Sequence, residues 1–590
     1  MILNSLLKNT RLMCLAGFLG ITLPQMTAAP IEHIGDRYIM HVSEMELTGE
    51  ESLLDVLMMC PEVISLDGNN IIGGDPFANQ YGKFVIRIDN QEYGLDYATL
   101  LHHFKAREIE SIKVCQNAEV MKGCSSLKKV IDITLRKGEN GVSGRAGLFG
   151  DTYGGGKGIV SVLSQQDDLR ILSHVEGNFQ RTSNSDKDAY QNQSSNTINH
   201  YSHEGAKLNV LWTPTSKDIL EVDAMQTYTR NHFTHSPAEY VRAYHLQADY
   251  TRTLGENGSS ILFTLGAEHI SDNGRTQEES QTFPYQNHST YPFAVVEYAT
   301  PVFTKDLWIT AGFEGGLSIE KNCIADYINH SNYEDFYVQL DYNIGKWGFM
   351  AGERYRIINF RPKQISSVSN WKHTTRNHIY SFSTYYTFTP GHTLQGTFCR
   401  RIFNPEFGDF VTAGDMEGAW KPTYTTDIRN SLANVMELKY TYSKPNLVVS
   451  TSVKNIHQHL IDNDNTLGIG TTAFWHTGIL RLTAGFNYFW ERAETPVEET
   501  SLRDTSYHNF AVFKLAPQLT LPDGWRLTSN LIWCTYRHTA TPAYTPANLY
   551  AEVGVYKNIG KHLTLEGRFH DIASQHFGNR AATIGCTYYF

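Results

Sequence analysis

Three close pairs of histidines are the residues of this sequence best suited to bind a metal ion or haem. The pairs are His200 with His203, His232 with His235, and His457 with His459. Imidazole nitrogen is a common ligand of metals and of haem iron. The chain contains 24 histidines, however, and so many in a polar chain place some of them close together without a purpose. We therefore expect no metal site and no cofactor.

The eight cysteines of the chain are scattered, and no two of them have the CxxC spacing of a metal cluster or redox centre. Cys14 falls in a segment that we expect to be removed. Cys115 and Cys124 either form a disulfide in an oxidising compartment or remain two thiols, and the sequence leaves both possibilities open. Without Cys14, seven cysteines remain, and an odd number leaves at least one thiol unpaired.

Sequence signatures of catalysis and of nucleic-acid binding are missing. The chain lacks GxSxG, HExxH, a Walker loop and a GxGxxG turn. A catalytic Ser/His pair assembled from distant strands would leave no such signature, so catalysis by such a pair is the alternative that these absences do not exclude. The net charge of -11, with both signs interspersed and no basic patch, argues against a nucleic-acid partner. We predict a protein that is not an enzyme.

The first 29 residues have the features of a secretory signal peptide. Lys8 and Arg11 precede an apolar run at 12–23, and small residues follow at 27–29. A membrane anchor would need roughly 20 apolar residues. We therefore expect export of the chain and cleavage near residue 29.

From about residue 139 onward the sequence alternates between apolar and polar residues, which is typical of β-strands. The stretch FYVQLDYN, for example, places Phe336, Val338, Leu340 and Tyr342 on one face and Tyr337, Gln339, Asp341 and Asn343 on the other. Charges of both signs on the polar faces suit a wet lumen better than the core of a soluble sandwich. Aromatic residues make up 12% of the chain although its mean hydropathy is only -0.35. A transmembrane β-barrel reconciles these values, because only alternate residues face lipid.

Short turns and longer polar segments alternate along this region. The longer segments at 181–202, 230–239, 272–290, 319–333, 360–376, 403–430 and 492–505 are predicted to be loops at one rim of the barrel. Counting the strands between them gives about 22 antiparallel strands. Side chains cannot fill a barrel of that width, so its lumen is either open or plugged.

The chain ends on ATIGCTYYF with no polar tail. We predict that this stretch is the closing strand of the barrel, paired with the first strand near Val142. Cys586, Tyr588 and Phe590 then face lipid, with the terminal aromatic ring in the interfacial girdle.

Residues 30–138 differ from the rest and predict a compact α+β module of a size that fits inside the barrel. A helix from Glu50 ends at Pro61, a hairpin turns at 89–90, a short helix follows Asp96, and strands cover EIESIKVC and KKVIDITLRKG. The predicted domains are a signal peptide at 1–29, a plug at 30–138 and a transmembrane barrel at 139–590.

This order of a helix ending in Pro-x-Val, the IDNQ hairpin, REIESIKV and VIDITLRKG resembles the plug domain of TonB-dependent outer-membrane receptors. The stretches YATPVFTKDLWITAGFEGGLS, FYVQLDYNIGKWGFMAGERYRI and HTLQGTFCRRIFNPEFGDF resemble landmarks of the Bacteroidetes-type barrels of that superfamily. The resemblance covers nearly all of the mature chain. It implies a Gram-negative outer-membrane protein that binds a small solute and passes it inward when a TonB-type inner-membrane protein pulls on the plug.

The resemblance also assigns roles to residues. It implies that Phe590, Tyr588 and Cys586 form the signal read by the barrel-assembly machinery, and that Arg400 and Arg401 pair with plug or lumen carboxylates. Segments 272–290 and 403–430 would set ligand selectivity, although 404–427 also fits a plain solvated loop. The best candidate for a TonB box is DRYIMHV at 36–42, which matches poorly. A passive channel or a surface-binding barrel without energy coupling is therefore the alternative.

Overall fold

The computed structural model describes residues 31–590 with gaps, and residues 1–30 lie outside the described part together with the predicted signal peptide. The longer gaps are 65–71, 74–83, 93–100, 116–128, 188–193, 234–238, 365–371, 404–410, 414–421, 425–430, 497–502, 539–543 and 573–580. The predicted short helix after Asp96 and the thiol of Cys124 fall within these gaps. Among the described residues, no helix has the length and hydrophobicity needed to cross a lipid bilayer.

The N-terminal module is built around a six-stranded sheet of order β1-β2-β7-β8-β5-β6. Its strands are β1 (Ile31–Ile34), β2 (Arg37–Met40), β5 (Phe84–Ile88), β6 (Gln91–Glu92), β7 (Ile109–Cys115) and β8 (Lys129–Leu135), and its helices are α2 (Leu53–Leu57) and η2 (Ala106–Glu108). The short strands β3 (Val63–Ile64) and β4 (Ile72–Gly73) pair separately. The strands on either side of the predicted turn at 89–90 pair with each other, both later strands are confirmed, and the first helix is shorter than predicted.

Most of the candidate TonB box at 36–42 lies in an inner strand of the plug sheet. Residues Arg37–Met40 form β2, which pairs with β1 on one side and β7 on the other. Tyr38 and Met40 are fully buried in the core of the module. Tyr38 and Met40 point into the core while Ile39 between them is only half-buried, which is the alternation of a strand in a sheet with one buried face.

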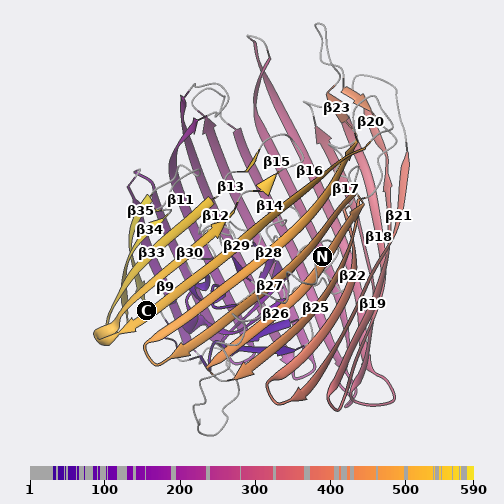
Figure 1. Cartoon of the computed structure of the whole chain (residues 1–590). Helices are drawn as coiled ribbons and strands as arrows, with labels where there is room; N and C mark the ends of the chain where they lie inside the picture. Colours follow the sequence, from indigo (N-terminus) through magenta and orange to yellow (C-terminus); the bar gives the residue numbers. More distant parts are fainter. Residues whose placement is uncertain are drawn as a thin grey trace.

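A closed antiparallel barrel surrounds this module (Figure 1). Its strands are β9 (Gly141–Asp151), β10 (Gly156–Gln166), β11 (Leu169–Lys187), β12 (Ser194–Thr215), β13 (Asp218–Phe233), β14 (Glu239–Leu254), β15 (Ser259–Glu278), β16 (Gln281–Pro301), β17 (Leu307–Asn322), β18 (Tyr327–Ile344), β19 (Trp347–Phe360), β20 (Pro362–Gln364), β21 (His373–Thr389), β22 (His392–Phe403), β25 (Ser431–Lys444), β26 (Leu447–His459), β27 (Asn463–Thr477), β28 (Leu480–Pro496), β29 (Arg503–Leu521), β30 (Trp525–Cys534), β33 (Asn548–Ile559), β34 (Leu563–His570) and β35 (Ala581–Tyr589). Both β19 and the short β20 pair with β18, so β20 continues the line of β19. The described barrel thus has the predicted 22 strands.

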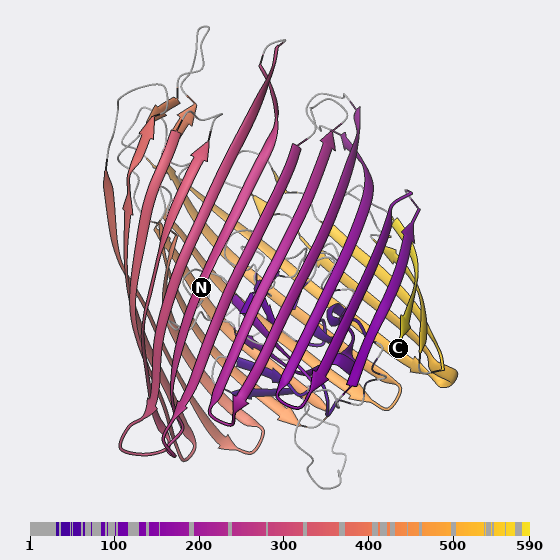
Figure 2. The same cartoon turned by 180° about the vertical axis from the view of Figure 1, so that it is seen from behind.

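The two rims of the barrel differ. One rim carries tight turns, such as the 3-10 turn η4 (Pro522–Gly524) between β29 and β30. The other rim carries the longer connections, and Figure 2 shows the indigo plug inside the barrel, nearer to the tight-turn rim. Small two-stranded sheets lie in two of the longer connections, namely β23 (Val411–Ala413) with β24 (Pro422–Tyr424) and β31 (Arg537–His538) with β32 (Tyr544–Thr545).

Several segments predicted as loops are largely strand. The segment 272–290 lies in the hairpin of β15 and β16, whose register runs from Ser260–Ala299 to Glu278–Gln281. Much of 181–202 and 319–333 is likewise paired strand. Crossing a bilayer takes only about 9–11 residues, so these longer strands carry the wall beyond the membrane. Beyond the membrane both faces of a strand are polar, so these parts lack the apolar–polar alternation that identified the membrane-spanning parts of the same strands.

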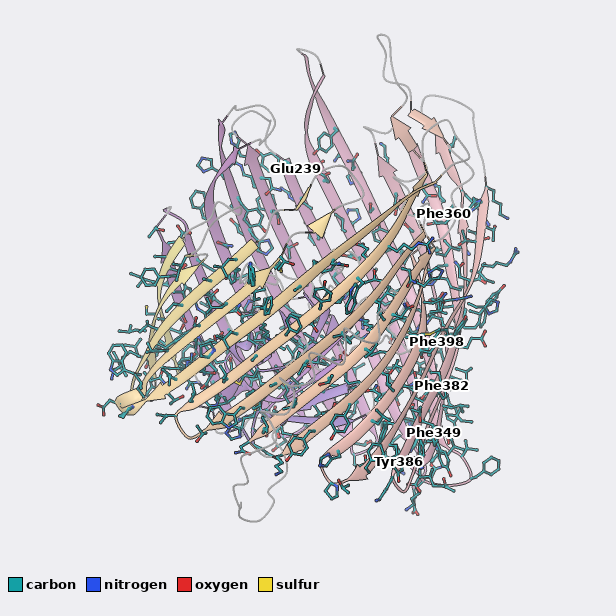
Figure 3. The ribbon with its side chains drawn as sticks, in the orientation of Figure 1. Glu239, Phe349, Phe360, Phe382, Tyr386 and Phe398 are labelled. Atoms are coloured by element: carbon teal, nitrogen blue, oxygen red, sulfur yellow. The ribbon has the colours of Figure 1, made fainter. Side chains whose placement is uncertain are left out.

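The barrel is apolar outside and polar inside, as the alternation predicted. On β18 the outward Phe336, Val338 and Leu340 are 41–49% exposed, whereas the inward Gln339 is fully buried. Figure 3 shows Phe398, Phe382, Phe349 and Tyr386 one below the other along one side of the wall. Large exposed apolar side chains on a barrel surface are accounted for by contact with lipid.

The C-terminal strand closes the barrel as predicted. β35 pairs with β9 from Thr583–Asp151 to Tyr589–Arg145, and Phe590 exchanges two backbone hydrogen bonds of 2.9 Å with Gly144. Ile584, Tyr588 and Phe590 are at least half exposed on the outer face, and the Cys586 thiol is exposed beside them. A side chain at Gly144 would lie 2.5 Å from the Phe590 ring and 2.7 Å from the Ser161 carbonyl oxygen, so the seam requires glycine there.

The lipid-facing assignment predicts the effect of an outward charge. Replacing Val338 with Arg near the middle of the apolar band should lower the free energy of unfolding in vesicles by about 2–4 kcal/mol, and the same change at Ile344 by the tight turn by about 0–1 kcal/mol. Denaturant titration of the folded protein measures both. Equal effects at the two positions would contradict the assigned membrane band.

The seam predicts that assembly depends on the last residue. Removing Phe590 deletes both seam hydrogen bonds and one girdle ring, so the outer-membrane level of the truncated chain should fall several-fold. Phe590→Tyr, which keeps the bonds and the ring, is the matched control. Levels of the truncated chain equal to those of the full chain would refute the role of this residue in closure.

Candidate functional site

The short helix α2 carries Asp55 toward the barrel wall, and Glu51 lies just before the N-cap of this helix. Its N-terminus is fixed by a capping box in which the Asp55 amide donates to Ser52 Oγ (3.2 Å) and the Ser52 amide donates to Asp55 Oδ2 (3.0 Å). Such caps stabilise a helix by about 1 kcal/mol. Leu53, Leu54, Val56 and Leu57 are buried, so the helix is held on its apolar sides while Asp55 is oriented by its own cap.

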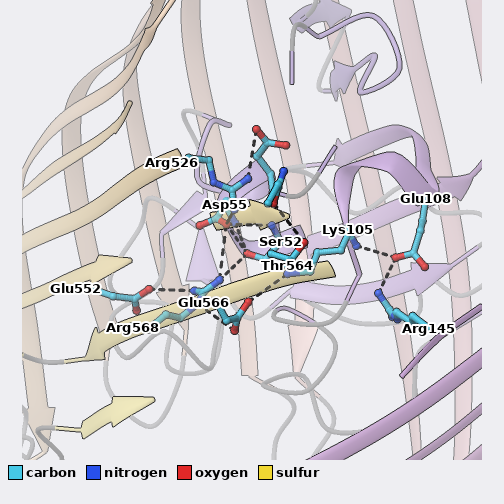
Figure 4. A network of polar contacts seen from close by, with 12 residues as sticks. Ser52, Asp55, Lys105, Glu108, Arg145, Arg526, Glu552, Thr564, Glu566 and Arg568 are labelled. Carbon is cyan, nitrogen blue, oxygen red and sulfur yellow. Dashed lines mark hydrogen bonds and ion pairs between the residues drawn. The ribbon is translucent and has the colours of Figure 1, made fainter. Parts of the chain in front are cut away.

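Two arginines of the barrel meet these acidic groups (Figure 4). Arg526 of β30 lies 3.4 Å from Glu51 Oε1 and 3.5 Å from Asp55 Oδ2. Arg568 of β34 lies 3.7 Å from Asp55 Oδ2 and donates to Ser52 Oγ at 3.1 Å. The plug helix is therefore joined to two barrel strands by a shared set of ion pairs.

A plug lysine makes the reciprocal contact with a barrel acid. Lys105 Nζ lies 3.4 Å from Glu566 Oε2, and the same carboxylate lies 3.9 Å from Arg568 Nε through its other oxygen. Arg568 is also paired with Glu552 of β33 at 3.2 Å. The contact thus joins the plug to three neighbouring strands, β30, β33 and β34.

An aromatic ring lies at the centre of this cluster. The Tyr556 ring of β33 has the Arg526 guanidinium at 4.0 Å, the Arg568 guanidinium at 5.2 Å and the Lys105 ammonium at 6.0 Å from its centroid. Cations near an aromatic face are attracted to its quadrupole, most strongly where water is excluded. We call Glu51, Asp55, Lys105, Arg526, Glu552, Tyr556, Glu566 and Arg568 the anchor cluster.

Every charged group of the anchor cluster is removed from water, since the side chains in these ion pairs are at most 8% exposed. Burial by itself opposes the charged form of Asp55, but Arg568 and Arg526 outweigh it and hold the pKa of Asp55 below its ordinary value. Burial lowers the pKa of Lys105, against the attraction of Glu566. Buried ion pairs add little net stability, yet losing one partner is costly because a bare charge is left behind.

Further polar contacts surround the anchor cluster. Glu108 of η2 pairs with Arg145 of β9 at 2.6 Å, and the Arg107 guanidinium stacks at 3.5 Å on the ring of Tyr589 in β35. Lys514 of β29 donates to the carbonyl oxygens of Cys60 and Val63. The plug therefore touches both strands of the barrel seam.

An apolar patch on the inner wall completes the contact. Val448, Phe474, Phe489, Phe510, Val512, Ile532 and Tyr550, from β26 to β33, belong to the same buried core as the plug residues. Phe489 and Phe510 stack with centroids 4.9 Å apart. Lumen positions of a wet barrel are polar, so this apolar patch marks where the plug packs against the wall.

Local sequence pattern indicates the side of the wall for some members of the anchor cluster but not their meeting. Glu552, Glu566 and Arg568 stand on the polar faces of alternating strands, which is the pattern of lumen-facing residues. Nothing in the sequence showed that they meet Asp55 or Lys105 more than 400 positions away. The feature of the sequence that could have predicted the plug contact is the pair of apolar residues Phe510 and Val512 at inward positions of β29, where a water-filled barrel would have polar residues.

The described histidines of the three candidate pairs are not gathered into a metal-ligand set. His200 and His232 are opposite each other on β12 and β13, with ring centroids 6.2 Å apart. His203 faces inward and lies 3.3 Å from Glu176. His235 and the His459 side chain are outside the described residues. Within the described ranges, no three His, Cys, Asp or Glu side chains are arranged to hold a metal ion.

The interpretation of Arg400 is wrong with respect to its partner. Its Nε donates to the amide oxygen of Asn434 at 3.1 Å and its guanidinium lies 4.8 Å from the Tyr380 centroid. No carboxylate pairs with it among the described side chains. Strand alternation is the physical reason: Cys399 is buried inward, so Arg400 points outward, away from the lumen. The Arg401 side chain, most of 403–430 and the Cys115 thiol are outside the description.

No known family model and no curated protein matches this chain by sequence. Solved structures do match. The siderophore receptor PiuA of Acinetobacter baumannii has 10% identity and a TM-score of 0.68 over 94% of this chain and 97% of its own. The ferric-catecholate import receptor Fiu of E. coli K12 has 12% identity and a TM-score of 0.68 over 96% and 99%. The copper transporter OprC has 9% identity and a TM-score of 0.70 over 96% and 100%.

The chain has the fold of the TonB-dependent receptors. This is the fold that the plug and barrel motifs of the sequence resemble, and it is confirmed over nearly the full chain. The Bacteroidetes-type subgroup and the domain limits at 29 and 138 stay predictions. In this receptor fold, the anchor cluster lies where the plug meets the wall and is our candidate functional site.

The anchor cluster predicts a strong coupling between plug and barrel. Lys105→Met leaves the buried Glu566 carboxylate without its lysine partner, and Glu566→Gln leaves the buried Lys105 ammonium without its carboxylate. Each single variant should therefore lower the free energy of unfolding by about 3 kcal/mol. The double variant should be less destabilised than the sum, with a coupling of about 1–3 kcal/mol. Thermal unfolding monitored by plug proteolysis provides the measurement.

The matched control for this cycle is Glu110→Gln, because Glu110 is an exposed plug acid that accepts a hydrogen bond from Ser43 within the plug. It should change stability by less than about 0.5 kcal/mol. Strict additivity of the Lys105 and Glu566 variants would mean that the two side chains do not hold the plug to the wall.

Proposed function

We propose that this protein lies in the outer membrane of a Gram-negative bacterium, binds a small solute at the cell surface and admits it when the plug is displaced. The anchor cluster is the observation that carries the proposal. It joins the wall to a separate folded module that lies inside the barrel, and each of the plug–wall contacts described above involves at least one side chain. A module held in this way can be moved without breaking the hydrogen-bonded wall.

The chemistry of the contact favours a plug that can be released. Ion pairs between plug and wall can be exchanged for water as the module moves, because the desolvation cost of burying the charges is regained when they are hydrated. A plug sealed by apolar packing alone would gain no such compensation. The apolar patch on β26–β33 covers one side of the plug, and we infer that this side is the hinge or the last contact to open.

The edge strand β1 is the part of the plug best placed for an energy-coupling partner. Among the described strands it pairs with β2 only, so it is an edge of the plug sheet, and it lies beside β25 of the wall. A partner of the TonB type, which the resemblance implies, can add a strand at such an edge and pull. Force on β1 passes through β2 to β7 and so to the centre of the plug sheet.

The ligand class is proposed from the solved structures with this fold. They are described as receptors for siderophores, among them ferric enterobactin, and as a copper transporter. We therefore propose a metal ion or metal chelate as the solute. Transport without a chemical reaction is the activity that this arrangement supports.

A reversible cross-link tests whether the plug moves. Glu108 and Arg145 are 2.6 Å apart across the plug and wall, and Glu108 is 31% exposed, which gives a reagent access. The variant Glu108→Cys/Arg145→Cys should take up radioactive ferric enterobactin or copper before treatment, lose at least tenfold of that uptake when a short cleavable bis-thiol reagent bridges the plug to β9, and recover after reduction. Surface binding should stay within about twofold.

Treated wild-type protein and the two single-cysteine variants are the controls, because the sequence contains eight native cysteines, of which Cys60, Cys399, Cys534 and Cys586 are free thiols in the described part of the chain. Unchanged uptake in the bridged variant would favour the passive channel. Ion conductance in planar bilayers separates that alternative further, since the intact chain should conduct far less than a chain without residues 31–136.

A further inference from the structure

A polar row crosses the outer surface of the barrel at the level where the lipid-facing side chains end. Its members are adjacent in register on five strands: Arg400 of β22, Asn434 of β25, His457 of β26, Asn465 of β27 and Arg492 of β28. Their inward neighbours Cys399, Val435 and Ile456 form a buried cluster, so the row itself faces outward. None of the functions considered above uses these residues.

The row borders a pocket of about 360 Å³ on the outer wall. Its lining residues are Tyr380, Phe398, Arg400, Asn434, Met436, Asn455, His457 and Asn465. Asn455 donates to Asn465 at 2.9 Å, and the Tyr380 and Phe398 rings are 5.7 Å apart. The pocket therefore combines a cation, several amides and an aromatic floor.

Arg400 is oriented into this pocket by two contacts that leave its terminal nitrogens available. Nε donates to Asn434 Oδ1 at 3.1 Å and the guanidinium lies 4.8 Å from the Tyr380 centroid. Among the described side chains, no carboxylate meets either Nη atom. The acid nearest in register is Glu353 of β19, opposite Tyr380, and it is engaged by His378 Nδ1 at 2.8 Å.

The height of the row places it at the headgroup level. Along β25, Asn434 lies eight residues from Tyr442 near the tight-turn rim, and Met436, Leu438 and Tyr440 lie between them on the outer face. At about 3.3 Å per residue and a strand tilt near 40°, this is about 20 Å of height, close to the apolar band of about 25 Å. Trp490 and Phe398 lie just below the row, where an aromatic girdle belongs.

We propose that this pocket binds the phosphorylated headgroup of an outer-leaflet glycolipid, with the acyl chains lying along Met436, Leu438 and Leu467. A guanidinium fork and amide donors match phosphate oxygens, and the pocket lining contains no acid. The positive charge of the row contrasts with the net charge of -11 of the whole chain. The ligand needs an anionic head above an apolar tail, which a free soluble anion lacks.

Binding of lipopolysaccharide to the detergent-solubilised full chain tests this proposal, with native mass spectrometry as the readout. Wild-type protein should retain the lipid, and enzymatically dephosphorylated lipopolysaccharide should bind about tenfold more weakly. Arg400→Gln should lower affinity for the phosphorylated form about tenfold, the effect of one lost charge-assisted hydrogen bond. Arg400→Lys should lie between the two.

The control is Arg252→Gln, which removes an arginine whose side chain is 53% exposed and lies 3.5 Å from Asp218 by a tight turn, at the opposite rim. This variant should bind like the wild type, and a heat-modifiable gel shift verifies that each variant is folded. Inorganic phosphate at the same concentration should not displace the lipid. Equal binding by Arg400→Gln and the wild type, or no preference for the phosphorylated lipid, would overturn the proposal.

Discussion

The constraint on which the rest of the structure depends is the width of the barrel. A wall of 22 strands cannot be filled by its own inward side chains, and an unfilled lumen would leave an open pore. The chain meets this constraint with a separate sheet and helix inside the wall. Because the strands of the wall already pair with one another through their backbones, the wall holds the plug through its side chains. The anchor cluster follows from that limitation.

The seam of the barrel lies beside this contact. β35 closes on β9, and both strands also touch the plug through Tyr589 and Arg145. The inward and outward faces of the last strand thus serve different purposes: Tyr589 receives Arg107 of the plug, whereas Phe590 and Tyr588 face lipid. Closing the wall and seating the plug share residues at one place, which ties correct assembly of the barrel to correct placement of the module within it.

Much of the architecture could be predicted from the sequence because a barrel strand has only two faces. The alternation around Phe336 and Val338 identified the lipid side, and the short turns at positions such as Pro522–Gly524 fixed the strand count. The pattern failed where both faces are polar, as in the β15–β16 hairpin, which we expected to be a loop. At β2 the candidate TonB box proved to be an inner strand of the plug sheet, paired on both sides.

The contacts of the candidate site were beyond the sequence for a different reason. Asp55 and Arg526 meet only because the plug is seated in one orientation, and no local pattern encodes that orientation. Arg400 shows the same limit: its position in the strand alternation places it outside the barrel, whereas the family resemblance implied a lumenal carboxylate partner. Register, rather than residue type, decides the side of the wall on which a charge acts.

The central claim is that the plug is a separately held unit whose contacts yield before those of the wall. Pulling the folded protein in a membrane by β1 from the tight-turn side, one molecule at a time, tests it most directly. We expect the plug to leave in one or a few low-force steps with a contour length close to that of residues 31–136, while the barrel stays folded. Extraction of barrel strands at forces equal to or below that of the first plug step would contradict this account.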